Sequence, residues 1–347
     1  MIHIGMDVHK KHSTFCVLDP AGTVVVRGKV PSTEDGWRSV LTRWPAADMQ
    51  VAVETGGLTW WLVDVARQLG IEPVVVDARQ FKLVASSKKK TDRRDAFHLA
   101  EAVRTNIARL CSVAVPSVRA RSGRALLQAR ATIVKQCTMS RNAALGLLRS
   151  VGLSMTKRRF HSDAHWDDTV ASTMIPEWMR PLLGAHRAMW KSAEALRARM
   201  DRQVDSEFAA WPEAQPLLDM PGFGPLVSLA VASSVDDPKR FKGQKQVASY
   251  GGIVPSVRDS GDHESRGAIT RQGRSLLRLY LVQAAHSAFR SKALSPALRR
   301  WAMRLLVRKG RAVAAIALGH KLLTIAFRLL SRGERYNPNF GADAMLA

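Results

Sequence analysis

The chain has 347 residues, of which 46% are hydrophobic, so it is long enough for more than one domain and is not generally disordered. It has 53 Lys and Arg residues against 29 Asp and Glu residues, a net charge of +24 spread along the chain, which favours a polyanionic partner and nucleic acid over a membrane. Three scattered cysteines exclude a disulfide framework or a cysteine zinc site, and the absence of an apolar run of membrane-span length or of a signal-peptide pattern predicts a cytoplasmic protein.

The first 112 residues alternate between strand and helix patterns, as in an α/β domain. Strands are expected at residues 2–8, 13–18, 23–30, 50–54 and 73–76, and helices at 34–44, 58–69, 79–86 and from about 92 onward. Three strands of a meander followed by α-β-α-β-α is the element order of a ribonuclease-H-like domain.

Two acidic residues of this domain stand at strand ends. Asp7 ends the first strand and Glu54 ends the fourth. If these strands are neighbours and parallel, both carboxylates emerge at the same edge of the sheet, where open α/β sheets place their sites. Each acid also has a structural interpretation, because a strand-end acid commonly caps a turn.

A second acidic pair begins the helix that follows. Asp92 and Asp95 are three residues apart and share one helix face, with Thr91 as the expected N-cap. Adjacent acids repel unless a cation lies between them, so the pair, together with Asp7 and Glu54, predicts one or two Mg²⁺ ions presented to a nucleic-acid backbone. Alternatively, the acids pair locally with arginines at a solvated helix start. The basic residues that would approach the phosphates are Lys88, Lys89, Lys90 and Arg93.

Residues 113–213 predict long helices, with a loop at 156–166 that contains His161 and His165. The two histidines have no third ligand nearby in the sequence, which favours a solvated loop over a metal site. Apolar residues at steps of three and four form a seam along the last of these helices, which either packs helices of one chain together or forms a projecting coiled coil that makes oligomers. The residues of this seam are Met189, Ala193, Leu196, Met200, Val204, Phe208 and Trp211.

Residues 214–347 predict a mainly α domain. Gly222 and Gly224 are typical of a helix-hairpin-helix-like element whose backbone N–H groups bind phosphate, or else of a plain helical corner. Ser260 lies in an expected arginine-rich loop, where its hydroxyl could attack phosphorus, or it is an ordinary loop serine. Residues 296–333 predict two basic amphipathic helices broken at Gly310, suited to phosphates more than to a membrane surface. The arginines around the serine that would balance the growing charge are Arg258, Arg266, Arg271 and Arg274.

Taken together, these motifs resemble the insertion-sequence transposases with a DEDD carboxylate tetrad, also called bridge-RNA-guided recombinases. Residues 5–10 (Gly-Met-Asp-Val-His-Lys) resemble the family's first strand, and residues 54–57 (Glu-Thr-Gly-Gly) its Glu-x-x-Gly. Residues 90–96 match Lys-x-Asp-x-x-Asp-Ala, and residues 221–224 and 252–261 resemble the domain that carries a nucleophilic serine. The similarity covers nearly the whole chain in the family's order, with small departures after Glu54 and at Gly251.

The resemblance implies a RuvC-like domain over residues 1–112, a coiled-coil and oligomerisation segment over 113–213 and a transposase domain over 214–347. Asp7, Glu54, Asp92 and Asp95 would bind Mg²⁺. Ser260 would join covalently to a DNA 5′ phosphate and leave a free 3′ hydroxyl for strand exchange. The implied partners are double-stranded target and donor DNA, a bridge RNA that pairs with both, and further copies in a tetramer, a dimer of dimers with catalytic sites shared between subunits. The expected location is the bacterial cytoplasm or nucleoid.

Two other functions fit parts of the sequence. A Mg²⁺-dependent junction-resolving nuclease would activate water and would need no serine nucleophile. A non-catalytic nucleic-acid scaffold would use the acids structurally, although unpaired carboxylates gathered at one sheet edge would be costly without a cation.

Overall fold

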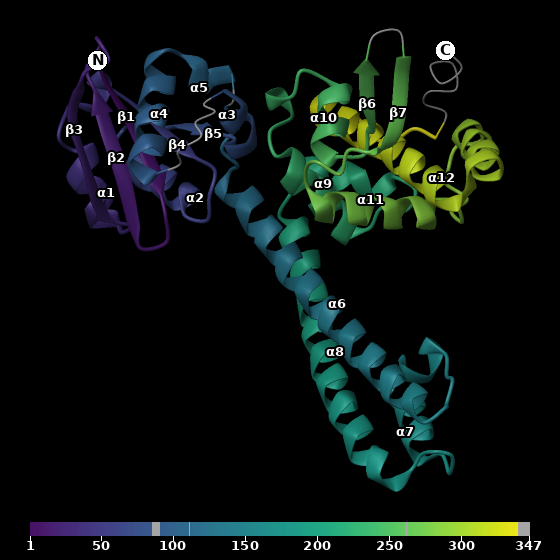
Figure 1. Ribbon diagram of the computed structural model, residues 1–347. Helices are drawn as coiled ribbons and strands as arrows, with labels where there is room; N and C mark the ends of the chain where they lie inside the picture. Colours follow the sequence, from purple (N-terminus) through teal and green to yellow (C-terminus); the bar gives the residue numbers. More distant parts are fainter. Residues whose placement is uncertain (85–90, 111, 261–262, 339–347) are drawn as a thin grey trace. The chain divides into compact units, whose positions relative to one another are not determined.

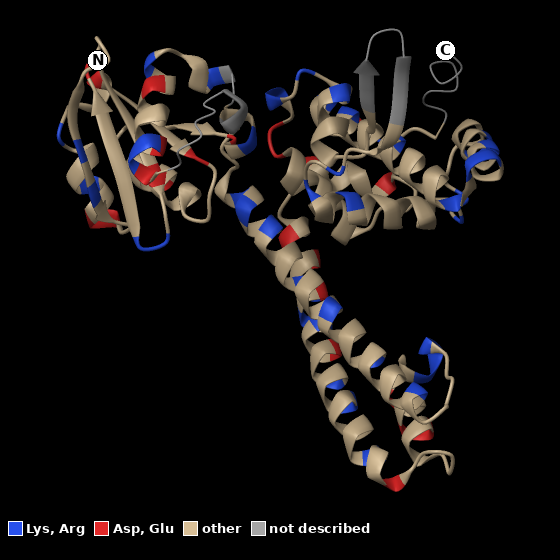
Figure 2. Cartoon of the chain, in the orientation of Figure 1, with Lys and Arg blue, Asp and Glu red and all other residues tan. Residues whose placement is uncertain are grey.

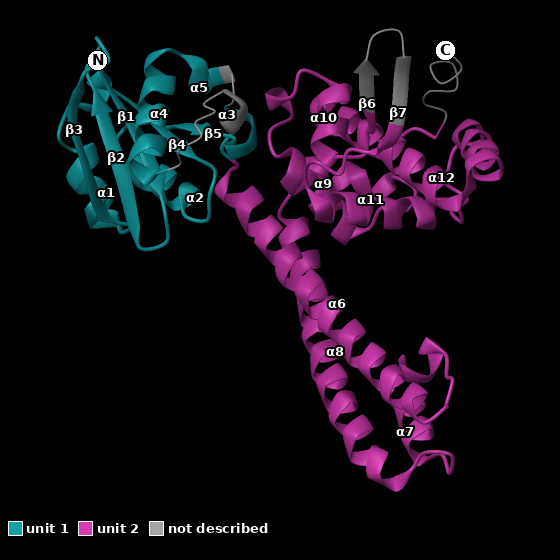
Figure 3. Cartoon of the chain, viewed as in Figure 1, with its two compact units in different colours: residues 1–115 teal, residues 116–347 magenta. Residues whose placement is uncertain are grey.

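The computed structural model describes residues 1–84, 91–110, 112–260 and 263–338, without the side chains of 82–84, 110, 257–260 and 263–266 (Figure 1). The chain divides into two compact units, Met1–Val115 and Pro116–Ala347 (Figure 3). The division predicted at residue 213 stays a prediction.

The first unit is a mixed α/β domain built on a five-stranded sheet in the order β3-β2-β1-β4-β5. The first three strands form an antiparallel meander, whereas β4 lies parallel to β1 and to β5. The predicted succession of meander and parallel strands is therefore confirmed. The strands are β1 (Ile2–Val8), β2 (His12–Leu18), β3 (Val24–Pro31), β4 (Met49–Glu54) and β5 (Val74–Val76).

Alternating side chains of the sheet face different helices. Ile4 and Met6 belong to a core that includes Trp37 and Leu62 from the helices α1 and α2. Helix α1 ends before the predicted residue 44, since Pro45 disfavours a helical conformation just before it. The helices of this unit are α1 (Glu34–Leu41), η1 (Ala46–Asp48), α2 (Thr59–Gln68), α3 (Ala78–Val84), α4 (Asp92–Arg104) and α5 (Ile107–Leu110).

Helix α4 covers the other face of the sheet very closely. A β-carbon at Gly5 would lie 2.1 Å from the carbonyl oxygen of Ala96 and 2.3 Å from the amide nitrogen of Ala100. Only glycine lets the backbones of β1 and α4 approach to this distance. The position of Asp92 and Asp95 over the sheet therefore depends on a glycine two residues before Asp7.

The second unit begins with two long antiparallel helices, α6 (Val118–Ser150) and α8 (Arg180–Ala209), which lie side by side (Figure 1). Ion pairs join them at Arg130–Asp201, 2.5 Å, and Arg141–Glu194, 2.8 Å. The loop predicted at 156–166 is partly helical, because Ser162 caps a new helix there. The elements between α6 and α8 are η2 (Lys157–Phe160), α7 (Asp163–Ala171) and η3 (Glu177–Met179).

The predicted apolar seam of α8 is only partly buried. Val204 and Phe208 lie in the core, but Met189 is 62% exposed and Leu196 is 40% exposed. Trp190, 5% exposed, is buried in place of Met189 and packs near Trp166 of α7. Helical spacing cannot choose between adjacent apolar residues, and the larger aromatic ring removes more apolar area from water.

The rest of the second unit is mainly helical and contains one two-stranded antiparallel sheet, β6–β7. Ser260 ends β6 and pairs with His263 of β7. The prediction of a loop around Ser260 is therefore wrong: these strands are rich in polar residues and lack the apolar alternation by which a strand is recognised. The elements are η4 (Pro212–Asp219), α9 (Pro225–Val235), η5 (Pro238–Arg240), α10 (Gln244–Gly251), β6 (Pro255–Ser260), β7 (His263–Ile269), α11 (Ser275–Ala288) and α12 (Pro296–Arg332).

Helix α12 is interrupted at Gly310, whose φ of 80° and ψ of 169° are non-helical, and this confirms the predicted break. Contrary to the sequence expectation, α12 contains a stretch long and apolar enough to cross a membrane. Half of that stretch is buried, and Leu318, Leu322 and Leu323 belong to the core of this unit. Packing within the domain thus accounts for its apolar character.

Candidate functional site

The parallel pairing of β1 and β4 brings Asp7 and Glu54 to one edge of the sheet. Met6 pairs with Val53, so the next residue of each strand is one of the two acids. Both acids lie on the face covered by α4, because side chains two residues apart in a strand share a face and Gly5 meets that helix. Asp7 is only 8% exposed, and Glu54 is half-buried.

The turn after β4 is held by Thr59. Its hydroxyl accepts a hydrogen bond from the Gly56 N–H, 2.7 Å, and donates to the carbonyl oxygen of Glu54, 2.8 Å. The Thr59 hydroxyl makes both of these hydrogen bonds, and the Glu54 carboxylate takes part in neither of them.

Helix α4 supplies the other two acids at its first turn. Thr91 is the N-cap, as predicted, and its carbonyl oxygen accepts from the N–H groups of Arg94, 2.8 Å, and Asp95, 3.0 Å, although its side chain makes no capping bond. Asp92 is exposed, and Asp95 is half-buried. The capped turn thus directs two acids into the region where β1 ends.

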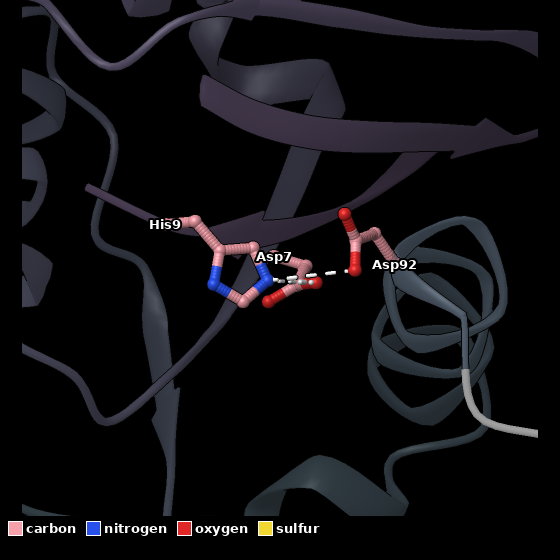
Figure 4. Close-up of side chains that lie close together, drawn as sticks. All are labelled: Asp7, His9 and Asp92. Carbon is pink, nitrogen blue, oxygen red and sulfur yellow. Dashed lines mark hydrogen bonds and ion pairs between the residues drawn. The ribbon is translucent and has the colours of Figure 1, made fainter. Parts of the chain in front are cut away.

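His9 lies between two of the acids (Figure 4). Its Nε2 is 3.0 Å from Asp7 Oδ2 and 3.7 Å from Asp92 Oδ1. Asp7, His9 and Asp92 each have one possible ligand atom within 4.8 Å of those of the other two. Among the described residues, neither Glu54 nor Asp95 belongs to this group. His9 was not among the predicted site residues, although its place two residues after Asp7, on the same side of an extended chain, was an available signal.

The electrostatics of this cluster favour a cation. Burial raises the pKa of Asp7 above its usual value; contact with His9 opposes the shift, and the negative charges of Asp95 and Asp92 add to it. Carboxylate oxygens are the ligands that hard divalent ions prefer, and an imidazole is also a common metal ligand. Asp7, His9 and Asp92 therefore offer a set of ligand atoms that suits a divalent metal. The imidazole of His9 lies near both carboxylates.

A cavity of about 650 Å³ adjoins Asp92 within the first unit. Its lining includes three basic residues, Arg27, Lys29 and Arg93. Lys and Arg residues are spread over both units (Figure 2), and three of them line this cavity together with Asp92. The cavity is thus suited to a nucleic-acid phosphate next to the acidic cluster. The predicted phosphate contacts Lys88, Lys89 and Lys90 lie outside the described residues.

Among the predicted residues of the second unit, Ser260, Arg258 and Arg266 lie on the β6–β7 hairpin, and their side chains are outside the described set. Arg271 is exposed after the hairpin. Arg274 is half-buried, and its Nε donates a hydrogen bond to the Tyr250 hydroxyl, 2.7 Å.

The two predicted phosphate-binding glycines have different surroundings. Gly222 has a φ of 81°, and a β-carbon there would lie 2.2 Å from the carbonyl oxygen of Ala284, so glycine is required for this corner to pack on α11. Gly224 is the N-cap of α9, with no heavy atom of a described residue within 4 Å of its added β-carbon. Packing therefore accounts for Gly222, and a phosphate contact at either glycine remains a prediction.

Two family models match the chain. Residues 4–152 match a transposase model for the DEDD type of IS110, and residues 214–300 match the transposase family IS116/IS110/IS902. The first match contains Asp7, Glu54, Asp92 and Asp95, and the second contains Ser260.

Individual relatives are similar over most of their length. A probable family 20 transposase of Pseudomonas aeruginosa is 31% identical over 292 residues, 83% of this chain and 86% of the relative. The transposase for insertion sequence element IS1111A of Coxiella burnetii is 26% identical over 96% of this chain and 90% of its own length. The transposase for IS1328 of Yersinia enterocolitica is 24% identical over 83% and 85%.

Proposed function

Because this chain belongs to the IS116/IS110/IS902 family of insertion-sequence transposases, enzymes that cleave and rejoin DNA, we propose that it is an RNA-guided, site-specific recombinase that uses both a metal-binding acidic cluster and Ser260. The observation that carries the metal half of the proposal is the meeting of Asp7, His9 and Asp92 where β1 ends. The strand order β3-β2-β1-β4-β5, with α4 across it, supports a RuvC-like, ribonuclease-H-like identity for this unit.

In the proposed mechanism Asp7, Glu54, Asp92 and Asp95 would hold Mg²⁺. When bound, the metal would supply polarisation of the scissile phosphate and stabilisation of the charge on the leaving oxygen. One carboxylate oxygen of Asp7 and one of Asp92 lie within 4.8 Å of each other, and the charges of Asp95 and Asp92 both act on Asp7. Arg27, Lys29 and Arg93 would orient the neighbouring phosphates of the same strand.

Ser260 acts as the nucleophile on DNA. A bond forms between its Oγ and phosphorus as the bond from phosphorus to the 3′ oxygen breaks, so one phosphodiester replaces another. The serine loses a proton, and the 3′ oxygen gains one and leaves as a hydroxyl. That hydroxyl, or one from another strand, can attack the phosphoserine in the reverse reaction, so rejoining needs no further source of energy.

The proposed partners are target and donor DNA, a bridge RNA that pairs with both, and further copies of the chain in a tetramer. The net charge of +24 supports nucleic-acid partners. The exposed apolar residues Met189 and Leu196 on α8 support association between copies.

Covalent trapping tests this function. The purified full chain is mixed with its candidate RNA, Mg²⁺ and DNA that carries the element junction, and is then denatured and searched for a protein–DNA adduct. We expect an adduct at Ser260 that Ser260→Ala and Asp92→Asn each abolish. Matched controls are Ser265→Ala, on the same hairpin, and Asp48→Asn, an exposed acid outside the cluster; both should retain the adduct.

Each alternative gives a different result. Cleaved DNA without an adduct would support a nuclease that activates water. Binding without cleavage, unchanged by Asp92→Asn, would support a scaffold. Recombination at full rate by protein free of RNA would exclude RNA guidance.

A further inference from the structure

A second polar cavity, of about 220 Å³, lies within the second unit where α6, α9 and α11 meet. Its lining includes Arg124 from α6, Ser233 from α9, and Arg274 and Ser275 at the start of α11. Side chains from three separate elements thus surround one small space.

The cavity is rich in positive charge. Arg124 and Arg274 line it. The guanidinium carbon of Arg240 lies 4.7 Å from the centre of the Tyr250 ring, whose hydroxyl accepts a hydrogen bond from Arg274. None of the three arginines takes part in an ion pair with a described residue. Burial, with the nearby charges of Arg274 and Arg240, lowers the pKa of Arg124 to about 10. Burial acts to raise the pKa of Tyr250, but the charges of Arg274, Arg124 and Arg240 outweigh it and lower that pKa. An anion would relieve this repulsion.

Part of the arginine cluster has a structural role. Arg124 Nε donates to the carbonyl oxygen of Ser233, 2.7 Å, and Arg240 donates to those of Ser234, 2.7 Å, and Val235, 2.8 Å. These carbonyls end α9, where cations are favoured. The Nε of Arg274 is held by Tyr250, and the other end of its guanidinium has no hydrogen bond to a described residue.

The first turn of α11 adds backbone donors to the same cavity. Gly273, Arg274, Ser275, Leu276 and Leu277 all line it. The N–H groups of Ser275, Leu276 and Leu277 make no hydrogen bond within the described ranges, as expected for the start of a helix that lacks a side-chain cap. Such N–H groups bind anions, and the helix dipole strengthens the attraction.

An independent observation comes from α9. Ser233 is 0% exposed, lines the cavity, and its Oγ has no hydrogen-bond partner in the described part of the chain. A buried hydroxyl without a partner is costly, so this one is suited to donate to a group that enters the cavity.

We propose that this cavity is a phosphate-binding site formed by Arg124, Arg274, Ser233 and the first N–H groups of α11, and that it holds a backbone phosphate of the DNA strand. The site is next to both ends of the β6–β7 hairpin: Tyr250 lies shortly before β6, and Arg274 shortly after β7. A strand gripped there would be fixed beside the hairpin that carries Ser260. The proposal of an anion site depends only on the geometry of the cavity, whereas the proposal that the bound phosphate belongs to DNA rests on the proposed function.

The site is tested first with inorganic phosphate and the full chain, by calorimetric titration at constant ionic strength. We expect saturable binding that Arg274→Gln weakens by about tenfold or more, because hydrogen bonds to charged groups are the strong ones. Ser233→Ala should weaken binding several-fold. Arg300→Gln, which removes an equal charge from an exposed site on α12, should leave it unchanged.

The backbone donor can be isolated by a pair of variants. Proline is tolerated at the first position of a helix, and Arg274 has an extended conformation that suits a following proline. Ser275→Pro should therefore keep the fold, measured by circular dichroism, while removing one N–H. We expect it to bind phosphate less tightly than Ser275→Ala. Equal phosphate affinity of Arg274→Gln, Ser275→Pro and the unchanged chain, or no saturable binding at all, would overturn the site.

A second experiment tests whether the bound phosphate belongs to DNA or to RNA. In the Ser260→Ala background, Arg274→Gln should weaken binding of junction DNA by about tenfold and leave the bridge RNA unaffected. Loss of RNA binding instead would overturn the assignment to DNA. If no covalent adduct forms but phosphate binds saturably and Arg274→Gln weakens that binding, the proposed serine chemistry is contradicted and the anion site is supported.

Discussion

At the residue scale, the surroundings of Asp7 in the folded chain disfavour the ionised form of its carboxyl group. Its pKa is raised by burial and by Asp95 and Asp92, so the folded chain binds its proton more tightly than the unfolded chain does. Stability contributed by the protonated form is present at low pH and is lost as the pH rises through this raised pKa.

Replacing Asp7 with Asn should therefore raise the Tm of the metal-free protein at pH 7–8, where the carboxylate is ionised, although we expect it to abolish the covalent adduct proposed at Ser260. Mg²⁺ should raise the Tm of the unchanged chain more than that of the variant, because a bound ion stabilises the folded state. Scanning fluorimetry in EDTA and in Mg²⁺ measures both effects, with Asp48→Asn as the control. A lower Tm of Asp7→Asn in EDTA would contradict this account of the site.

Gly5 is the residue that sets the distance between β1 and α4. Gly5→Ala places a β-carbon 2.1 Å from the Ala96 oxygen, so the helix has to move. We expect a loss of about 1–3 kcal/mol in the free energy of unfolding, the usual cost of overpacking, and loss of the adduct as Asp92 and Asp95 shift. Urea unfolding measures the first effect.

Gly57→Ala is the matched control for stability. It adds the same methyl group in the same unit, where no heavy atom of a described residue lies within 4 Å of the added β-carbon. Its free energy of unfolding should change by less than about 0.5 kcal/mol, as for most surface substitutions. Equal losses for both variants would mean that contact with α4 is not the cause.

At the scale of elements, α6 and α8 present an apolar groove of about 650 Å³ to solvent. Met139 from α6 and Met189 and Leu196 from α8 line it, and all three are exposed. Exposed apolar surface of this kind marks sites of association, so the groove supports the oligomerising alternative for these helices.

If copies of the chain associate through this groove, a charge in it should separate them without unfolding the chain. We expect Met189→Glu to reduce the mass measured by light scattering and to leave the Tm nearly unchanged, since the side chain is exposed. Met174→Glu is the matched control, because Met174 is also 62% exposed but lies outside the groove. An unchanged mass for Met189→Glu would mean that this groove does not hold copies of the chain together.

At the scale of the whole molecule, the net charge of +24 predicts strongly salt-dependent binding of nucleic acid. If about six to ten phosphates are contacted, affinity should fall by about 10³–10⁵ between 50 and 200 mM salt. Arg27→Gln, in the cavity beside the acids, should reduce the slope of log affinity against log salt by about one. Arg67, which is paired with Glu72, is the control, since Arg67→Gln should change the slope little.

Much of this molecule was predictable because local patterns carry it. The order of strands and helices in the first unit, Thr91 as the N-cap of α4 and the break at Gly310 all follow from residues close in sequence. The acids Asp7 and Glu54 were predicted to share a sheet edge because each ends a strand, and the parallel register of β1 and β4 places them there.

Contacts between distant segments were decided only by the tertiary structure. The hairpin around Ser260 escaped prediction because its pairing, not an apolar pattern, makes it a sheet. Helical spacing could not show that Trp190 is buried and Met189 exposed, since helix α7 supplies the packing partner. Arg124 and Ser233, 109 residues apart, meet in one cavity because α6 and α9 pack together, and no local pattern records that contact.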